Sequence, residues 1–306
     1  MVSLRVVLTV LGLLAISVPS ALAQPAFSAW SAPVNVGPIV NSAFTEGGPA
    51  ISKDGLSLYF HSERPGSLGS TDIWVSVRER DDQPWGAPRN LGPAVNTPGL
   101  EAVAALSRDE HWLFFSSDRG GSLGSTDIWV SYREHIHDPF DWQPAWNAGA
   151  GVNSVFADGA PSYFENGGGA PQLFFHSDRP GGLGGTDIYV SELSWNGTFG
   201  PASLVAELSS PSNEQHPSIR FDGLEMFFFS PRPGSLGGPD LWVATRKTVF
   251  DSWSTPTNMG PIVNSDLAEV QPYIASDRQT LYFQSPRPGG SGGQDIWMTT
   301  RSKGKP

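Results

Sequence analysis

One pattern of about 55 residues occurs five times along this chain, and it constrains the fold more than any other feature. Each copy opens with an aromatic residue and a short apolar segment that closes on Asn or Ser. Four of these segments have equal length, and one is a residue shorter: Trp30 to Asn41, Trp85 to Asn96, Trp142 to Asn153, Trp253 to Asn264 and the shorter Phe199 to Ser209. Self-similarity at a fixed spacing indicates a repeat architecture.

Charged residues recur at fixed places in the pattern. An acid follows the opening segment in every copy: Glu46, Glu101, Asp158, Glu214 and Glu269. After a turn, an apolar run such as Leu58-Tyr59-Phe60 leads to an arginine: Arg64, Arg119, Arg179, Arg232 and Arg287. A Gly-rich loop then leads to an Asp-Ile-Trp segment or a close variant, whose acids are Asp72, Asp127, Asp187, Asp240 and Asp295.

Each copy therefore holds four short runs rich in aromatic and β-branched residues, separated by turn residues. Four antiparallel strands form one sheet, which cannot bury both of its faces alone, so the five sheets must stack around an axis. The 35 glycines and 27 prolines suit many tight turns. The sequence predicts an all-β fold, a five-bladed β-propeller of four-stranded antiparallel blades.

The order of the segments predicts how the ring closes. The chain opens with a spare apolar segment at Trp30 and ends just after the Asp295-Ile-Trp segment, so the last blade lacks its outermost strand. We expect residues 30–37 to supply that strand, which removes an exposed sheet edge.

Two segments resemble a known repeat family. Phe115-Ser-Ser-Asp-Arg-Gly-Gly with Asp127-Ile-Trp129, and Phe175-His-Ser-Asp-Arg-Pro-Gly-Gly with Asp187-Ile-Tyr189, are similar to the WD40-like PD40 repeat. That repeat builds the propeller of TolB-type periplasmic proteins and occurs in OmpA-associated envelope proteins. The resemblance implies a propeller in a bacterial envelope or secreted setting.

The start of the chain differs in character from the rest. Arg5 precedes an apolar run from Val6 to Val18, and Ala21-Leu22-Ala23 supplies the small residues of a cleavage site. This arrangement predicts a signal peptide at residues 1–23, with residues 24–306 forming one propeller domain that is periplasmic or secreted. No other stretch is long and apolar enough to span a membrane after cleavage.

Charge and cysteine content limit the partners. The chain has a formal net charge of −11 and no cysteine, so it repels phosphate backbones and cannot form disulfides. We expect no nucleic-acid partner, a monomeric chain, and either an envelope protein or a glycan as ligand. We expect no cofactor.

Strand polarity brings the repeated charges to one end of the ring. The inner strand begins at the first acid, the second strand ends at the arginine, and the third begins at the Asp of Asp-Ile-Trp. We call this end the top face. Each arginine is expected to form structural ion pairs with two carboxylates, the inner acid and the third-strand aspartate of its blade, although the aspartate could equally cap its own loop. The inner acids are also binding candidates, and a cation at the channel mouth is an open alternative.

Positions that break the five-fold pattern are further binding candidates. Just before the repeated arginine, and two positions earlier, blades one to three carry mostly acids and imidazoles. The last two blades have Pro231 and Pro286, and Phe229 and Gln284, at these positions. One more imidazole lies on the fourth inner strand. The candidates are His61, Glu63, Asp118, His176, Asp178 and His216. Because loops on a rigid scaffold commonly carry function, the top face is the expected binding face.

Two functions remain open at this stage. Nearly identical loops on all blades favour a non-catalytic binding or scaffolding propeller of the cell envelope or secreted space. The alternative is a carbohydrate-active enzyme, similar to a glycoside hydrolase, that uses inner acids around a central pocket. The enzyme requires an asymmetric pocket with unpaired carboxylates, whereas in a scaffold every inner acid would be paired.

Overall fold

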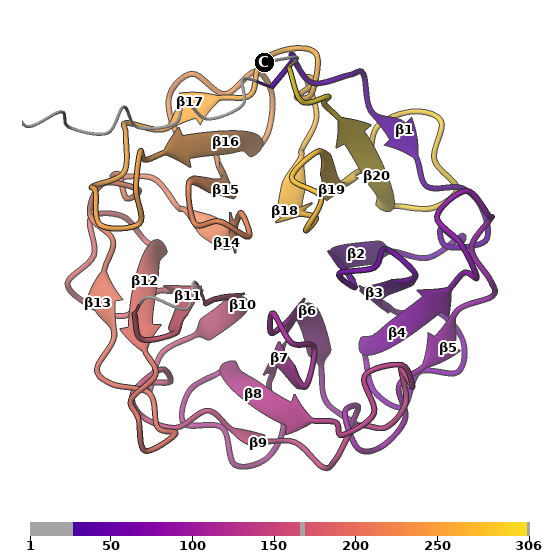
Figure 1. Cartoon of the computed structure of the whole chain (residues 1–306), viewed down its shortest axis with the longest axis horizontal. Coiled ribbons are helices and arrows are strands. Elements are labelled where there is room, and N and C mark those ends of the chain that lie inside the picture. Colours follow the sequence, from indigo (N-terminus) through magenta and orange to yellow (C-terminus); the bar gives the residue numbers. More distant parts are fainter. Residues whose placement is uncertain (1–26, 166–168, 305–306) are drawn as a thin grey trace, which may run out of the picture.

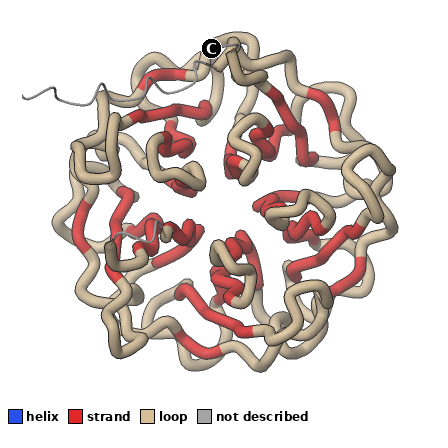
Figure 2. The backbone as a smooth tube through the Cα atoms, in the orientation of Figure 1, coloured by secondary structure: helices blue, strands red, loops and turns tan. Residues whose placement is uncertain are grey.

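The computed structural model describes residues 27–165 and 169–304, which form five four-stranded antiparallel sheets arranged in a ring about a central axis (Figures 1 and 2). This confirms the predicted five-bladed propeller. The predicted signal peptide lies outside the described residues. Within the described ranges there is no helix, and hence none that could cross a membrane.

The blades follow one another along the chain. Blade 1 contains β2 (Glu46–Ile51), β3 (Ser57–Ser62), β4 (Asp72–Val77) and β5 (Arg89–Asn90). Blade 2 contains β6 (Glu101–Leu106), β7 (Trp112–Ser117), β8 (Asp127–Tyr132) and β9 (Trp146–Asn147). Blade 3 contains β10 (Asp158–Phe164), β11 (Gln172–Ser177), β12 (Asp187–Glu192) and β13 (Ser203–Leu204). Blade 4 contains β14 (Gln215–Ile219), β15 (Glu225–Ser230), β16 (Asp240–Thr245) and β17 (Thr257–Asn258).

Blade 5 is built from both ends of the chain. It contains β18 (Val270–Ile274), β19 (Thr280–Ser285), β20 (Asp295–Thr300) and β1 (Val34–Asn35). Val34 pairs with Met298 and Asn35 with Trp297, in antiparallel register. The predicted closure by the N-terminal segment is confirmed.

Asparagine side chains hold this closure in place. Asn35 donates from Nδ2 to Asp295 over 3.0 Å, and Asn41 both donates to the carbonyl of Ile296 and accepts its N–H. In blade 1 the same contacts are made by Asn90 and Asn96, which belong to the segment after β4. The N-terminal segment thus supplies blade 5 with the bonds that other blades take from the segment following their third strand.

Every inner strand contains a bulge. The residue two positions after each inner acid has a φ between 50° and 54°, the left-handed region. Glycine suits this position in blade 1, where a Cβ on Gly48 would lie 2.7 Å from Nδ1 of His61. The other blades place Val103, Ala160, His216 and Gln271 there. Because the bulge breaks the two-residue alternation, the strand pattern alone does not say which side chains face the channel.

The core lies in layers between neighbouring blades. One apolar cluster joins Leu58 and Phe60 of blade 1 to Tyr282 and Ile296 of blade 5. Another joins Tyr59 of blade 1 to blade 2. Blade-to-blade burial makes the ring a single packed unit, which presents the inner strands and their turns rigidly around the channel.

Candidate functional site

The five inner acids are buried and ion-paired within their own blades. Each carboxylate is fully shielded from solvent and lies 2.5 to 3.1 Å from the Nη2 of the arginine of its blade. The pairs are Glu46 with Arg64, Glu101 with Arg119, Asp158 with Arg179, Glu214 with Arg232, and Glu269 with Arg287. The top mouth of the channel therefore presents none of these five carboxylates in an open pocket.

Blade 1 shows how completely each pair is enclosed. Arg64 donates to Glu46, to the carbonyl of Val40 at 2.5 Å and to Oγ of Ser62 at 3.2 Å. Its guanidinium lies over the rings of Phe60 and Trp74, with centroids 4.9 and 5.5 Å away. Arginine can do this because its planar group both stacks on rings and donates in a fork. We call this unit the arginine clasp.

The third-strand aspartates bond to their own loops instead of the arginines. Asp72 accepts the N–H groups of Leu68 and Gly69 at 2.7 and 3.0 Å, together with the amide of Asn90. Asp127, Asp187, Asp240 and Asp295 accept from their Gly-rich loops in the same way. These acids cap the loop, which is the alternative that the sequence left open.

The three top-face acids that break the pattern are exposed. Asp118 accepts the N–H of Leu100 and Asp178 accepts that of Ala157, both at 2.7 Å. Glu63 stands at the equivalent place in blade 1. Asp118 and Asp178 thus each hold the loop that enters an inner strand of their own blade.

The candidate histidines lie inside the ring and tie blades together. Nδ1 of His61 accepts the N–H of Val103 at 3.4 Å, and Nδ1 of His176 accepts that of His216 at 3.3 Å. Burial lowers the pKa of His61 and of His176 to about 4, and lowers that of His216 well below its usual value. Both acceptor nitrogens must be unprotonated, so these imidazoles are neutral in the folded chain.

These contacts predict an acid-sensitive fold. Histidines in the unfolded chain bind protons below about pH 6.5, whereas folded His61 resists protonation until about pH 4. The unfolded state binds more protons in this window, so the stability that is complete above pH 6.5 is lost as the pH falls toward 4, by up to about 3 kcal/mol per imidazole. Denaturant unfolding at pH 7 and pH 4.5 measures this loss.

A matched pair of variants isolates the histidine contribution. His61→Asn keeps an acceptor for Val103 without a titrating ring, so it should lose less stability on acidification than the unaltered chain. His137→Asn, at an exposed position, should behave like the unaltered chain. An identical pH dependence for His61→Asn and the unaltered chain would contradict the assignment.

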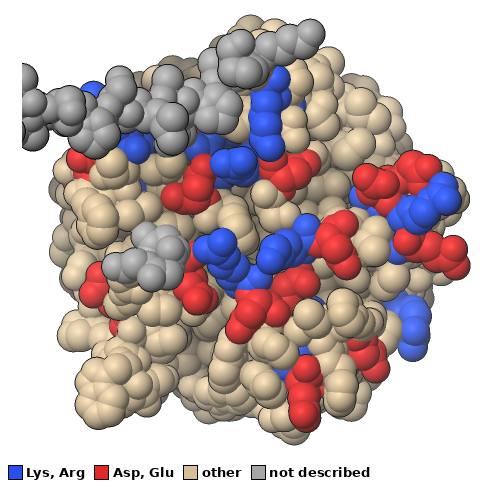
Figure 3. Space-filling view, viewed as in Figure 1, with Lys and Arg blue, Asp and Glu red and all other residues tan. Residues whose placement is uncertain are grey.

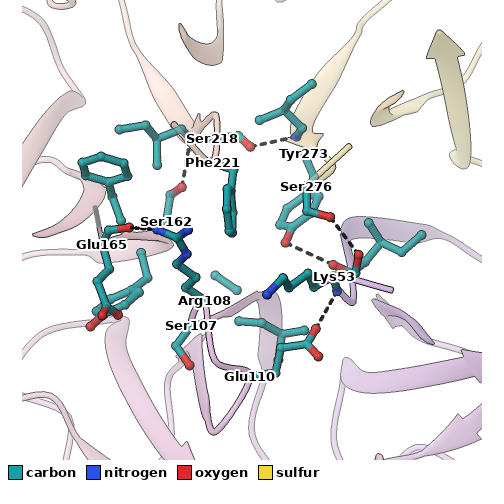
Figure 4. Close-up of a pocket in the computed structure, with 17 residues that line it drawn as sticks. Lys53, Ser107, Arg108, Glu110, Ser162, Glu165, Ser218, Phe221, Tyr273 and Ser276 are labelled. Carbon is teal, nitrogen blue, oxygen red and sulfur yellow. Dashed lines mark hydrogen bonds between the residues drawn. The ribbon is translucent and has the colours of Figure 1, made fainter. Parts of the chain in front are cut away.

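A cavity of about 70 Å³ lies at the opposite end of the channel, where the inner strands end. We call this end the bottom face; Figure 3 looks onto it and shows side chains of both charges around its centre. The cavity is lined by groups from all five inner strands and their turns, among them Lys53, Glu110, Ser162, Phe221 and Tyr273 (Figure 4). Among the described residues no cluster of three or more His, Asp or Glu side chains could hold a metal ion.

Five equivalent positions around this mouth carry five different residues. The residue seven positions after each inner acid is Lys53, Arg108, Glu165, Phe221 or Ser276, and all five line the cavity. We call these five the mouth ring. A feature that only builds blades would repeat, so this asymmetry marks the bottom mouth as the candidate site.

Glu110 lies beside the mouth ring in a strained turn. Its φ is 63°, at the turn position where blades 1 and 4 have Gly55 and Gly223 with φ of 76° and 75°, and where blade 5 has Arg278 with φ of 65°. This conformation is costly for a residue with a side chain. One carboxylate oxygen accepts the N–H of Lys53 at 2.6 Å, and burial raises the pKa of Glu110 despite that bond and the nearby Arg133.

A cationic and aromatic cluster completes the site. The guanidinium of Arg108 lies 4.3 Å from the ring centroid of Phe221, and Nζ of Lys53 lies 6.0 Å from it. Deeper in, hydroxyls are used by the scaffold: Ser162 and Ser218 accept the N–H groups of Ile219 and Ile274, and Tyr273 donates to the carbonyl of Ile51. Lys53, Arg108 and Phe221 of the mouth ring therefore lie together at the open end of the cavity.

Sequence reasoning missed this site because it followed the repeated charges to the top face. An alignment of the five copies could have indicated it, because the position seven residues after the inner acid carries a different residue in every copy. Glu110 follows Asp109 where two copies have glycine after Asp54 or Asp222 and the last copy has Arg278 after Asp277.

Solved structures share this fold. An α-L-arabinofuranosidase from Lactobacillus brevis aligns with a TM-score of 0.61 and 14% identity over 87% of this chain and 92% of its own. The catalytic domain of a GH62 α-L-arabinofuranosidase from Coprinopsis cinerea gives 0.58 and 14% over 91% and 98%, and an arabinanase from Bacillus subtilis 0.58 and 13% over 88% and 97%. No family model matches this chain, and no curated protein matches it.

Two expectations from the sequence are wrong. The arabinofuranosidases and the arabinanase that share this fold are glycoside hydrolases, not PD40 or TolB-type propellers, so the recognised repeat family is corrected. The same finding overturns the expected non-catalytic binding or scaffolding role. The alternative, a carbohydrate-active enzyme, remains a proposal. The envelope-protein partner and the monomeric state stay predictions.

Proposed function

We propose that this chain is a carbohydrate-active enzyme of the glycoside-hydrolase type, with its glycan bound at the cavity of the bottom face. The observation that carries the proposal is Glu110, a carboxylic acid at the rim of the cavity whose pKa is raised by burial. A general acid must keep its proton near neutral pH until the leaving oxygen takes it. The similarity in fold to arabinofuranosidases and arabinanases supports the same class.

Hydrolysis of a glycosidic bond uses two carboxyl groups, one that protonates the leaving oxygen and one that acts as base or nucleophile. In this proposal Glu110 is the acid. Glu165 is the second carboxylate that lines the cavity, and it reaches the mouth from blade 3 while Glu110 reaches it from blade 2. The buried inner acids of the top face hold the blades together and take no part.

The strained turn offers a sharp test of Glu110. Glu110→Gln should lower the rate of reducing-sugar release from a responsive glycan by about 10²- to 10⁴-fold, because a positioned proton donor contributes that much. Glu110→Gly should be equally inactive yet at least as stable as the unaltered chain, since glycine adopts the left-handed conformation without strain. The assay panel contains arabinan, arabinoxylan, glucuronoxylan and pectin.

Matched variants complete the test. Glu165→Gln should also abolish hydrolysis, whereas Glu134→Gln, at an exposed position, should leave the rate unchanged. Full activity of both Glu110 variants on a glycan that the unaltered chain cleaves would exclude Glu110 as the acid. No release from any glycan in the panel would count against the proposed function.

We also propose that the enzyme works outside the cytoplasm, in the periplasm or the secreted space. The basic, apolar and small-residue order of residues 1–23 supports export. An exported hydrolase would meet the polymeric glycans that lie outside the cell.

A further inference from the structure

Two cations at the bottom mouth have no acid partner. Within the described ranges, no carboxylate lies within 4.0 Å of Nζ of Lys53 or of the guanidinium of Arg108. By contrast, each clasp arginine is paired with its inner acid. Two cations without an ion-pair partner therefore line the same cavity, in a chain that is acidic and has few lysines.

Both cations are placed to meet a ligand. Nζ of Lys53 ends in the open centre of the cavity, 6.0 Å from the centroid of the Phe221 ring (Figure 4). Arg108 uses one nitrogen on the carbonyl of Glu165 at 3.3 Å and lies against the same ring. The remaining donors of both groups face solvent at the mouth, where both residues are exposed.

The neighbouring carboxylates are engaged elsewhere. Glu110 accepts the backbone N–H of Lys53, and burial raises its pKa. Glu165 forms a side-chain hydrogen bond with Tyr163. Among the described residues neither acid lies within 4.0 Å of Nζ of Lys53 or of the Arg108 guanidinium, so both cations keep donors for a ligand.

The charges of the two faces add an independent argument. At the top face the described cations are the five clasp arginines, each already paired, while exposed acids stand there without a cationic partner: Glu63, Asp118, Asp178, Glu207 and Asp266. The bottom mouth carries acids too, among them Glu110 and Glu165, but it is the end at which Lys53 and Arg108 form no ion pair with them. Cations with donors left for an anion therefore distinguish the bottom mouth from the top face.

We propose that the cavity binds an anionic sugar, a glycan residue whose carboxylate or sulfate group is held by Lys53 and Arg108. The anionic group follows from the two cations, and the sugar rests on the proposed function. Guanidinium and ammonium groups are the usual partners of both kinds of anion. A cavity of about 70 Å³ holds such a group with part of its ring, so the charged residue is a chain end or a branch, and the rest of the glycan lies on the bottom face.

Binding measurements with three probes test this inference. D-glucuronate, glucose 6-sulfate and glucose are titrated into the mature chain by calorimetry at low ionic strength. We expect at least one anionic sugar to bind ten-fold or more tightly than glucose, and added salt to weaken it. The stronger of the two anionic probes identifies the group.

Paired variants assign the contacts. Lys53→Met and Arg108→Gln should each lower the affinity for the anionic sugar at least five-fold. Lys247→Met and Arg80→Gln, at exposed sites away from the mouth, should change that affinity by less than two-fold. Thermal unfolding confirms that each variant is folded. Equal binding of glucose and the anionic sugars, binding of none of the three, or no effect of Lys53→Met, would overturn the inference.

The two proposals fail separately. Hydrolysis confined to neutral glycans would overturn the anionic subsite and leave the enzyme in place. Binding of an anionic sugar that depends on Lys53, with no hydrolysis of glucuronoxylan, pectin or the neutral glycans, would overturn the proposed hydrolase and leave the binding site.

Discussion

Replacing Arg119 with methionine is expected to lower the free energy of unfolding by about 3–5 kcal/mol, because it leaves the fully buried carboxylate of Glu101 without its counter-charge. Arg119 also donates to Oγ of Ser117 and to the carbonyl of Val95, and stacks on Phe115 and Trp129, all of which methionine loses in part. At about 2–4 °C per kcal/mol, the unfolding midpoint should fall by roughly 10 °C. Denaturant unfolding at neutral pH measures the change.

Two further variants show that the buried charge is the cause. Adding Glu101→Gln to Arg119→Met should recover part of the lost stability, since the neutral side chain needs no counter-charge. Asp118→Ala, beside Arg119 but exposed, removes one bond to the N–H of Leu100 and should cost about 1 kcal/mol. If Asp118→Ala unfolds the chain while Arg119→Met stays stable, the structural charge has been assigned to the wrong residue.

The repeat made the fold predictable, because each copy contains the same turn residues and apolar runs at the same spacing. A single four-stranded copy cannot bury both faces of its sheet, so the five copies must pack against one another. The extra segment at Trp30 can then complete only the last blade, which lacks its outermost strand. The clasp was also partly predictable, since an acid and an arginine at fixed positions in every copy indicate a pair. The partner of the third-strand aspartates was less certain, because an aspartate can accept hydrogen bonds from an arginine or from loop N–H groups equally well.

The candidate site was harder to predict for a physical reason. The left-handed residue in each inner strand shifts the register, so alternation does not say which residues reach the channel. The mouth ring lies after the strands end, where the copies diverge and no motif exists. Repetition points to what builds the blades, whereas Lys53, Arg108 and Glu110 are informative because they do not repeat.

Deleting residues 24–37 is expected to destabilise the whole ring in one step rather than loosen one end. The deletion removes β1 and with it the pairing to β20, the bond from Asn35 to Asp295, and the bonds of Ser28 and Ser31 to the last residues of blade 5. Several hydrogen bonds at about 1 kcal/mol each are lost, and β20 becomes an open edge. We expect a fall in the unfolding midpoint of 10 °C or more, and a tendency to self-associate.

The cooperative nature of this loss is the decisive measurement. Blade 5 packs on blade 1 through the cluster that joins Ile296 and Tyr282 to Leu58 and Phe60, so an opened blade 5 weakens the interface with blade 1 as well. Unfolding followed by tryptophan fluorescence and by far-UV circular dichroism should therefore give coincident transitions at the lower midpoint. Asn258→Ala breaks the equivalent bond to Asp240 inside blade 4, together with the bonds that Asn258 accepts from Gly260 and Asn264, without opening an edge. At about 1 kcal/mol for each bond, it should cost less than the deletion. A truncated chain that keeps its midpoint, or that unfolds blade 5 in a separate early step, would show that the N-terminal strand does not close the ring energetically.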